Sequence, residues 1–299
     1  MALVLLNPHA RGGRTRALAP DLRSELTRLD ATARLVVPES VPEAHAHITA
    51  MPGVRVVVVG GDGTLHQLLP ALLTRASEVA LVPAGSGDDG ARAFGLHGKP
   101  WRAALAFAMS APALPTDVGE VQTEHEKRPF ISSLALGFDA AVAQRALRGP
   151  SMLAGLPRYL LATLQEVATL RLYNVSVSAD GQPLHQGPAL FASTLNTASY
   201  GGGMPAVPHA RLADGRLDLL LAGRFTRAAT LAMLPRLLLG RHLGHAHVMC
   251  RPFQEAHVHG QEPLPLAADG ETMQAARQVR LRVRAGALRV VRVVPASAA

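Results

Sequence analysis

A short glycine-rich segment carries the residue types with the clearest chemical potential. Gly60-Gly61-Asp62-Gly63-Thr64 directly follows the apolar run 54–59. Glycines let a backbone come close to a ligand, and the successive amide groups of such a loop, together with the start of a helix, can bind a phosphate. Asp62 would repel a bare phosphate, which indicates a cation between the two. The segment favours a metal–nucleotide site; the alternative is a tight turn in which Asp62 or Thr64 only caps a helix.

Alternating strand and helix signals surround this segment in the first third of the chain. Apolar strands are expected over residues 3–6, 33–37, 54–59 and 79–82, and amphipathic helices over 18–29, 42–50 and 64–74. Such alternation over short connections predicts a parallel sheet covered on both faces. Three glycine-bearing loops, at 7–13, 60–64 and 83–90, follow strands of this sheet, at the edge where ligands bind in open α/β sheets. We expect a doubly wound α/β nucleotide-binding domain over residues 1–115.

The pattern changes after residue 115. Alternating or apolar runs at 130–134, 175–178, 217–221, 279–283 and 288–294 predict a mostly antiparallel, β-sandwich-like domain over residues 116–299. Helical segments near 152–170 and 228–239 interrupt it. Three Ala-Asp-Gly triplets place Asp180, Asp214 and Asp269 in expected hairpin turns. The local sequence does not say which of these aspartates, if any, does chemistry.

Composition narrows the classes of partner. The chain has 299 residues, 48% hydrophobic and only 4% aromatic, and its net charge of +8 comes from scattered arginines rather than from a basic block. We therefore expect no nucleic-acid partner, whereas a transient contact with an anionic membrane surface fits the charge. A single cysteine and the lack of a long apolar stretch predict a cytoplasmic protein, peripheral at the inner membrane surface. Cys250 is expected to pack as a small apolar residue, and His242-x-x-His245-x-His247 to lie on the surface.

Several further motifs have the order and spacing of a known family. The chain resembles bacterial diacylglycerol kinases and lipid kinases, which are related to sphingosine kinases. The resemblance implies an ATP- and Mg²⁺-dependent lipid kinase that transfers the γ-phosphate to a lipid hydroxyl, with diacylglycerol as the first candidate. The matching segments are Asn7-Pro8, Gly60–Thr64, Pro83–Asp89 with Ala91-Arg92, Asp117-Val118-Gly119, Leu136–Ala140, Tyr200–Met204, Asp214–Asp218 and Asp269-Gly270-Glu271.

The same resemblance implies roles for individual residues. Asp269 would be the general base, Asp62, Asp89 and Asp117 would hold Mg²⁺ through water, and a second, structural Mg²⁺ would bind near Asp214. The partner would be a lipid alcohol, and a homodimer is compatible with the sequence. The residues implied to bind the second Mg²⁺ are Asp214, Leu217 and Leu219. Those implied to contact the nucleotide are Asn7, Ser40, Gly60, Gly61, Asp62, Gly63, Thr64, Leu65, His66, Gly85, Ser86 and Gly87.

Departures from the family pattern keep two alternatives open. The family usually has an Asn-Glu pair where this chain has His66-Gln67, an Asn-Asp-Phe segment where it has Asp88-Asp89-Gly90, and often an asparagine at Ser132. These changes are compatible with a catalytically weak nucleotide- or lipid-binding module. NAD kinases share the Gly-Gly-Asp-Gly-Thr loop but hold the dinucleotide with an Asn-Glu pair, and no Asn-Glu dipeptide occurs in this chain. That enzyme is the less favoured alternative.

Overall fold

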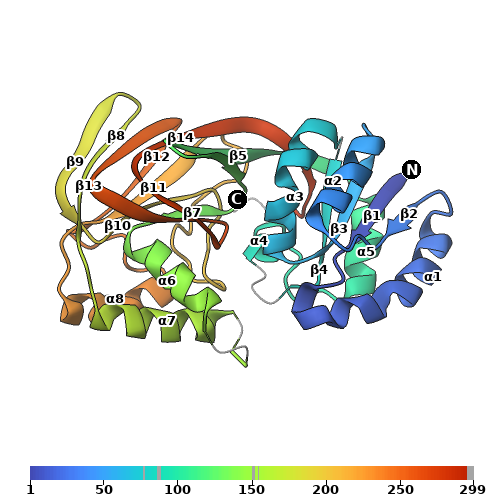
Figure 1. Ribbon diagram of the computed structural model, residues 1–299, viewed down its shortest axis with the longest axis horizontal. Helices are drawn as coiled ribbons and strands as arrows, with labels where there is room; N and C mark the ends of the chain where they lie inside the picture. The colour runs from blue at the N-terminus through green and yellow to red at the C-terminus, as the bar shows by residue number, and fades with distance from the viewer. Residues whose placement is uncertain (77, 86–88, 150–151, 154, 295–299) are drawn as a thin grey trace. The chain divides into compact units, whose positions relative to one another are not determined.

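The chain folds into two compact units (Figure 1). The computed structural model describes residues 1–76, 78–85, 89–149, 152–153 and 155–294. Unit 1 comprises residues 1–116 and 286–299, and unit 2 comprises residues 117–285. The predicted fold class, a parallel α/β domain followed by a mostly antiparallel β domain, is confirmed. The described residues from Gly286 onward cluster with unit 1, and Val290 near the end of the last strand pairs with Val79.

Unit 1 is built on a parallel sheet. Its strands lie in the order β14–β4–β3–β1–β2, with only the C-terminal end of β14 (Glu271–Val291) taking part, and neighbouring strands in it pair in parallel. Val57 and Val59 of β3 face one side of the sheet and Val56 and Val58 the other, and all four are fully buried. Apolar runs without polar alternation arise in this way when helices cover both faces. The strands are β1 (Ala2–Leu6), β2 (Arg34–Val36), β3 (Arg55–Gly60) and β4 (Glu78–Pro83).

The helices of unit 1 follow the strands, as the sequence predicts. Leu22 of α1 and Leu105 of α5 join Val57 and Val59 in one apolar cluster, so these two helices cover the same face. α3 packs on β3 and against α2. The helical elements are η1 (Ala10–Leu18), α1 (Ala19–Leu29), α2 (Val41–Ala50), α3 (Asp62–Arg75), α4 (Asp89–Ala93) and α5 (Trp101–Ser110).

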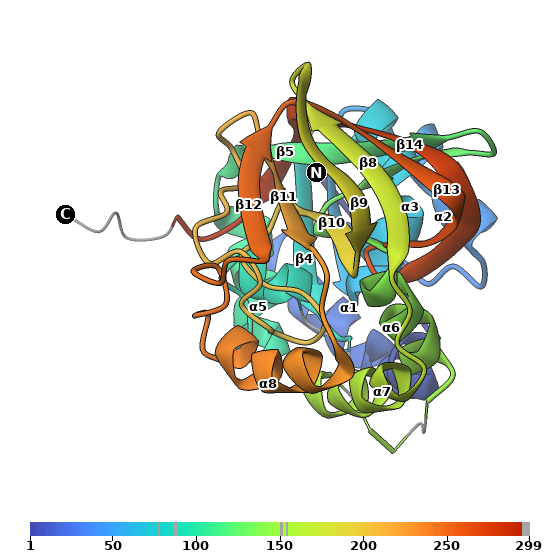
Figure 2. The ribbon, with the colours of Figure 1, turned by 90° about the vertical axis from the view of Figure 1, so that its left-hand side faces the viewer.

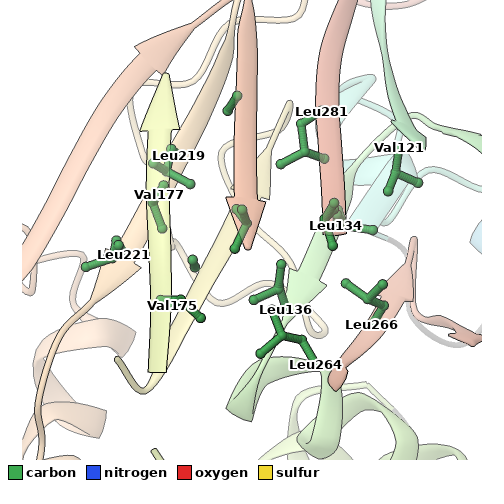
Figure 3. Close-up of a cluster of buried hydrophobic side chains, with 14 of the residues drawn as sticks. Val121, Leu134, Leu136, Val175, Val177, Leu219, Leu221, Leu264, Leu266 and Leu281 are labelled. Atoms are coloured by element: carbon green, nitrogen blue, oxygen red, sulfur yellow. The ribbon is translucent and has the colours of Figure 1, made fainter. Parts of the chain in front are cut away.

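Unit 2 is a mostly antiparallel β structure. Its main sheet has the order β12–β11–β10–β7–β13–β14, with β5 and β6 added beside β14 and with β8 and β9 added beside β13. The strands are β5 (Ala113–Thr123), β6 (Lys127–Phe130), β7 (Ser133–Leu136), β8 (Tyr173–Ala179), β9 (Gln182–Ala189), β10 (Phe191–Leu195), β11 (Leu217–Ala222), β12 (Val248–Phe253), β13 (Glu255–Ala268) and β14 (Glu271–Val291). Figure 3 shows valine and leucine side chains of β5, β7, β8, β11, β13 and β14 meeting in its core.

Three helices lie together beside the strands of unit 2 (Figure 2). They are α6 (Phe138–Leu147), α7 (Leu156–Ala168) and α8 (Arg227–Leu238). Phe138, Ala162 and Phe225 belong to the apolar cluster that joins them to the β structure. Among the described residues, no helix has both the length and the apolar character needed to span a membrane.

Candidate functional site

The glycine-rich loop between β3 and α3 packs tightly within unit 1. A Cβ atom at Gly60 would lie 2.7 Å from Oγ1 of Thr64, and one at Gly61 would lie 2.8 Å from Cα of Gly85. Neither glycine has a positive φ. Glycine is therefore needed here for close packing, of Gly60 on Thr64 and of Gly61 on the loop of Gly85, and not for a left-handed backbone. This packing fixes the amide groups at the start of α3 beside the loop that follows β4.

Side chains from the loop after β1 fasten the same region. Nδ2 of Asn7 donates to Oγ1 of Thr64 at 2.7 Å, and Nε of Arg11 donates to the carbonyl oxygen of Gly85 at 3.0 Å. Arg11 has a positive φ of 49°. The loops after β1, β3 and β4 thus contact one another at the carboxyl ends of three neighbouring strands, which is the edge where α/β sheets bind ligands.

Asp62 joins the first turn of α3 to the start of α4. Its Oδ2 accepts from the amide of Asp89 and its Oδ1 from the amide of Gly90, both at 2.9 Å. The carboxylate therefore caps α4, a role that the sequence left open. Oδ1 of Asp89 lies 3.6 Å from the guanidinium of Arg92. Asp62 and Asp89, two of the three expected Mg²⁺ ligands, are neighbours in unit 1.

The remaining nucleotide candidates of unit 1 have varied surroundings. Ser40 is exposed, and its Oγ accepts from the amide of Glu43 at 3.3 Å, which makes it the N-cap of α2. Leu65 and His66 are buried in α3. Ser86 and Gly87 lie outside the described residues.

In unit 2, the carboxylate of Asp269 is held by a row of backbone amides. Oδ2 accepts from Ile131 at 2.9 Å, and Oδ1 accepts from Ser132 at 2.7 Å and from Ser133 at 3.1 Å. Asp269 and Gly270 have φ values of 49° and 84°, so they form a left-handed turn between β13 and β14. Hydrogen bonds from N–H groups to an ionised carboxylate are strong and fix its orientation.

The three Asp-Gly turns are not equivalent. Asp180 repeats the φ of 49°, and its Oδ1 accepts from the amides of Gln254 and Glu255, both at 3.0 Å, on an exposed hairpin. Asp214 instead accepts from the amide of Arg216 at 3.0 Å. The aspartates of all three turns accept hydrogen bonds from backbone amides. Such bonds alone therefore do not identify Asp269 as a catalytic residue.

A buried asparagine connects Asp269 to Asp117. Nδ2 of Asn196 donates to the carbonyl oxygens of Asp117 and Ile131, both at 2.8 Å. Asn196 is only 1% exposed, and its Oδ1 is buried with no hydrogen-bond partner among the described residues. Since Ile131 also donates to Asp269, Asn196 links the expected metal ligand of unit 2 to the expected base. Sequence reasoning missed this residue, because a single asparagine after a strand belongs to no motif.

Asp117 and the segment near Asp214 also lie together. Oδ2 of Asp117 accepts from the amide of Gly215 at 2.7 Å, and the amide of Asp117 donates to Leu212 at 2.7 Å. The side chains of Leu217 and Leu219 are fully buried in the core of unit 2. Any metal contact of these two leucines would have to come from their backbone carbonyl groups.

A second hydrogen-bonded carboxyl group, that of the half-buried Asp139, lies near the start of α6. Oδ2 of Asp139 accepts from the hydroxyl of Tyr200 at 2.8 Å and from that of Ser193 at 2.9 Å. Burial raises the pKa of Asp139 to about 6, although both hydroxyl groups act to lower it. Asp139 and Tyr200 belong to two separate sequence motifs, and the structure brings them into one hydrogen-bonded group.

Comparison with known proteins identifies the family. Residues 1–121 match the diacylglycerol kinase catalytic domain, and residues 132–292 match the YegS C-terminal NAD kinase beta sandwich-like domain. A diacylglycerol kinase of Mycobacterium tuberculosis is 32% identical over 244 residues, 77% of each chain. A Pseudomonas aeruginosa protein named "Probable lipid kinase YegS-like" is 31% identical over 277 residues, 90% of this chain and 84% of that one.

Solved structures agree on the fold. The crystal structure of a diacylglycerol kinase from Bacillus anthracis superposes with a TM-score of 0.75 at 16% identity, covering 98% of this chain and 96% of that one. Both sequence matches and the shared fold confirm the family that the motifs indicated. This chain belongs to the diacylglycerol kinase and YegS-like lipid kinase family.

Proposed function

We propose that this protein transfers the γ-phosphate of ATP to the hydroxyl of a membrane lipid, with diacylglycerol as the first acceptor. The observation that carries the proposal is the buried link from Asp117 through Asn196 and Ile131 to Asp269. These hydrogen bonds connect two aspartates, Asp117 and Asp269, for which the family resemblance implies chemical roles. Lipid kinase membership supplies the reaction class.

The loops of unit 1 are proposed to bind the nucleotide. The contact between Gly61 and Gly85 keeps two stretches of backbone amides side by side, and the N-terminus of α3 adds a partial positive charge. Both features favour a bound polyphosphate. The guanidinium group of Arg11, which donates to the carbonyl oxygen of Gly85, adds a positive charge at the same loop.

The donor set fits Mg²⁺. Asp62 and Asp89 in unit 1, and separately Asp117 in unit 2, offer carboxylate oxygens, the ligands that this hard cation prefers. Mg²⁺ commonly keeps several waters when bound. The buried Oδ1 of Asn196 adds an oxygen that a hydrated cation could satisfy. When bound, Mg²⁺ would neutralise charge on the phosphate oxygens. Asp214, with the backbone of Leu217 and Leu219, is proposed for the second ion.

Asp269 is proposed as the group that accepts the proton of the lipid hydroxyl. Phosphoryl transfer asks the protein for positioning and for a carboxylate that orients the attacking oxygen. The amides of Ile131, Ser132 and Ser133 donate to that carboxylate and hold its side chain in one orientation. The lipid oxygen would form the new bond to phosphorus while its proton passes to Asp269 and ADP leaves.

The helical side of unit 2 supports contact with a bilayer. Six of the ten exposed large hydrophobic side chains of the described residues lie between 147 and 239 (Leu147, Met152, Leu164, Leu231, Leu238, Leu239). Exposed arginines stand at 224, 227, 236 and 241, and no acidic residue occurs over 219–254. Apolar side chains beside cations suit the surface of an anionic membrane. We propose this surface, centred on α8, as the one that meets the lipid.

The test is lipid phosphorylation by the purified protein. The protein is incubated with Mg²⁺, γ-labelled ATP and mixed micelles that contain diacylglycerol, with a bacterial lipid extract and NAD as parallel acceptors. The proposal expects label in a lipid and none in NAD. Label in NAD would favour the NAD kinase alternative, and nucleotide binding without transfer to any acceptor would favour the weak binding module.

A further inference from the structure

Three side chains with different ligand atoms meet in unit 2. They are Asp218, which stands between Leu217 and Leu219 on β11, Cys250 on β12, and His209 in the loop before β11. Nε2 of His209 lies 3.8 Å from Sγ of Cys250 and 3.9 Å from Oδ1 of Asp218. All three ligand atoms lie within 4.8 Å of one another. The set comprises one nitrogen, one oxygen and one sulfur atom, which distinguishes it from a cluster of acidic residues or a lone cysteine.

The register of the sheet explains two of the three positions. In the antiparallel pair β11–β12, Asp218 stands opposite Pro252 and Leu220 stands opposite Cys250. Side chains two residues apart on a strand point to the same face, so Asp218 and Cys250 are diagonal neighbours. The side chain of Asp218 is only 11% exposed.

His209 comes from a loop that is anchored on both sides. Ala206 and Val207 are fully buried, and the amide of Ala210 donates to the carbonyl of Val207 at 2.9 Å. His242 is buried, so the surface position predicted for it was wrong, and its ring bonds to the carbonyl oxygen of Ala206 at 2.8 Å. The imidazole of His209 is therefore presented to the strand pair by an ordered segment, while its own ring stays largely exposed to solvent.

We propose that His209, Asp218 and Cys250 bind a borderline transition-metal ion, with Zn²⁺ as the best match. Zn²⁺ is bound by exactly these donor types, at about 2.0–2.3 Å in a tetrahedron, which places ligand atoms roughly 3.4–3.6 Å apart. The nitrogen–sulfur and nitrogen–oxygen separations of 3.8 and 3.9 Å exceed these values by about half an ångström or less. Three protein ligands leave the fourth position to water.

Selectivity follows from the sulfur atom. Cys250 would bind a metal ion as its thiolate, so binding requires loss of the thiol proton. A bound ion has to displace that proton, which soft or borderline ions do readily and Mg²⁺ does not. The site is thus distinct in chemistry from the all-oxygen sites proposed for Mg²⁺. It would fasten β11, β12 and the loop of His209 to one another.

The experiment uses the full chain without an affinity tag, with Zn²⁺ alone and Co²⁺ alone as probes. Equilibrium dialysis followed by metal analysis gives the stoichiometry, and we expect one ion per chain. Co²⁺ should also produce a thiolate charge-transfer band, and because the chain has a single cysteine, that band reports on Cys250 only. Mg²⁺ in excess should displace neither ion.

Two variants and a matched control decide the outcome. Cys250→Ser should abolish the Co²⁺ band, and His209→Ala, a change at an exposed side chain, should weaken Zn²⁺ binding at least tenfold, since even indirect partners of a metal commonly contribute that much. His245→Ala removes a histidine outside the cluster and should leave both readouts unchanged. Unchanged Zn²⁺ affinity in His209→Ala, or no cobalt–thiolate band in the unaltered protein, would overturn the proposal.

Discussion

Replacing Asp269 by asparagine tests whether its carboxylate acts in catalysis or only stabilises the turn. Asparagine tolerates the left-handed backbone, and its carbonyl oxygen can still accept from Ser132 and Ser133. Its amide nitrogen would then face the N–H of Ile131, leaving two donors together. An unpaired buried donor costs about 1–3 kcal/mol, so a modest loss of thermal stability is expected. Loss of the general base should lower kcat by roughly 10²–10⁴-fold.

Asp180→Asn is the matched control. Asp180 has the same φ, but a single oxygen accepts both of its amide partners, so asparagine can keep both bonds. Stability and lipid phosphorylation should stay close to those of the unaltered protein. The measurements are thermal unfolding, ATP affinity and steady-state kinetics for both variants. An Asp269→Asn protein that is folded, binds ATP and retains more than about a tenth of kcat would refute the base role.

Three further predictions concern other parts of the chain. Gly61→Ala should lower both the unfolding temperature and the ATP affinity, because its Cβ would lie 2.8 Å from a backbone atom, whereas Gly244→Ala, in open space, should change neither. The pKa of Asp139 is about 6 in the folded protein against an ordinary 3.8, so the folded state holds this proton more tightly than the unfolded state. The free energy of unfolding should therefore fall by up to about 3 kcal/mol as the pH rises from 4 to 7. Asp139→Asn should flatten this dependence when unfolding is measured at a series of pH values. Leu231→Glu should reduce cosedimentation with anionic vesicles severalfold, whereas Val41→Glu, an equally exposed change in α2, should not.

The sequence predicted the parts of the fold that local pattern determines. The run 54–59 is apolar at five of its six positions, without polar alternation, so a strand buried on both faces followed directly. Helices α5 and α6 were missed because their buried positions hold mainly alanine, which gives little periodic contrast. The return of β14 to the sheet of unit 1 depends on pairing between Val290 and Val79, which no local signal encodes.

The candidate site shows a similar division. Motif residues such as Asp62 and Asp269 could be selected from sequence, but the backbone amides that each carboxylate accepts could not, since those contacts arise from distant segments. Asn196 carried no signal beyond being polar after an apolar strand. The turn of Asp180 has the same φ as that of Asp269, but Asp180 is exposed and lacks the link through Asn196.

The most direct test of the proposed phosphotransfer counts two products in one reaction. ADP and phosphorylated lipid are measured together, with and without lipid acceptor, in the unaltered protein and in Asp269→Asn. The proposal predicts equal amounts of the two products, dependence of both on lipid, and loss of both in the variant. ADP formed without lipid product, or equal phospholipid formation in the variant, would contradict transfer to a lipid hydroxyl assisted by Asp269.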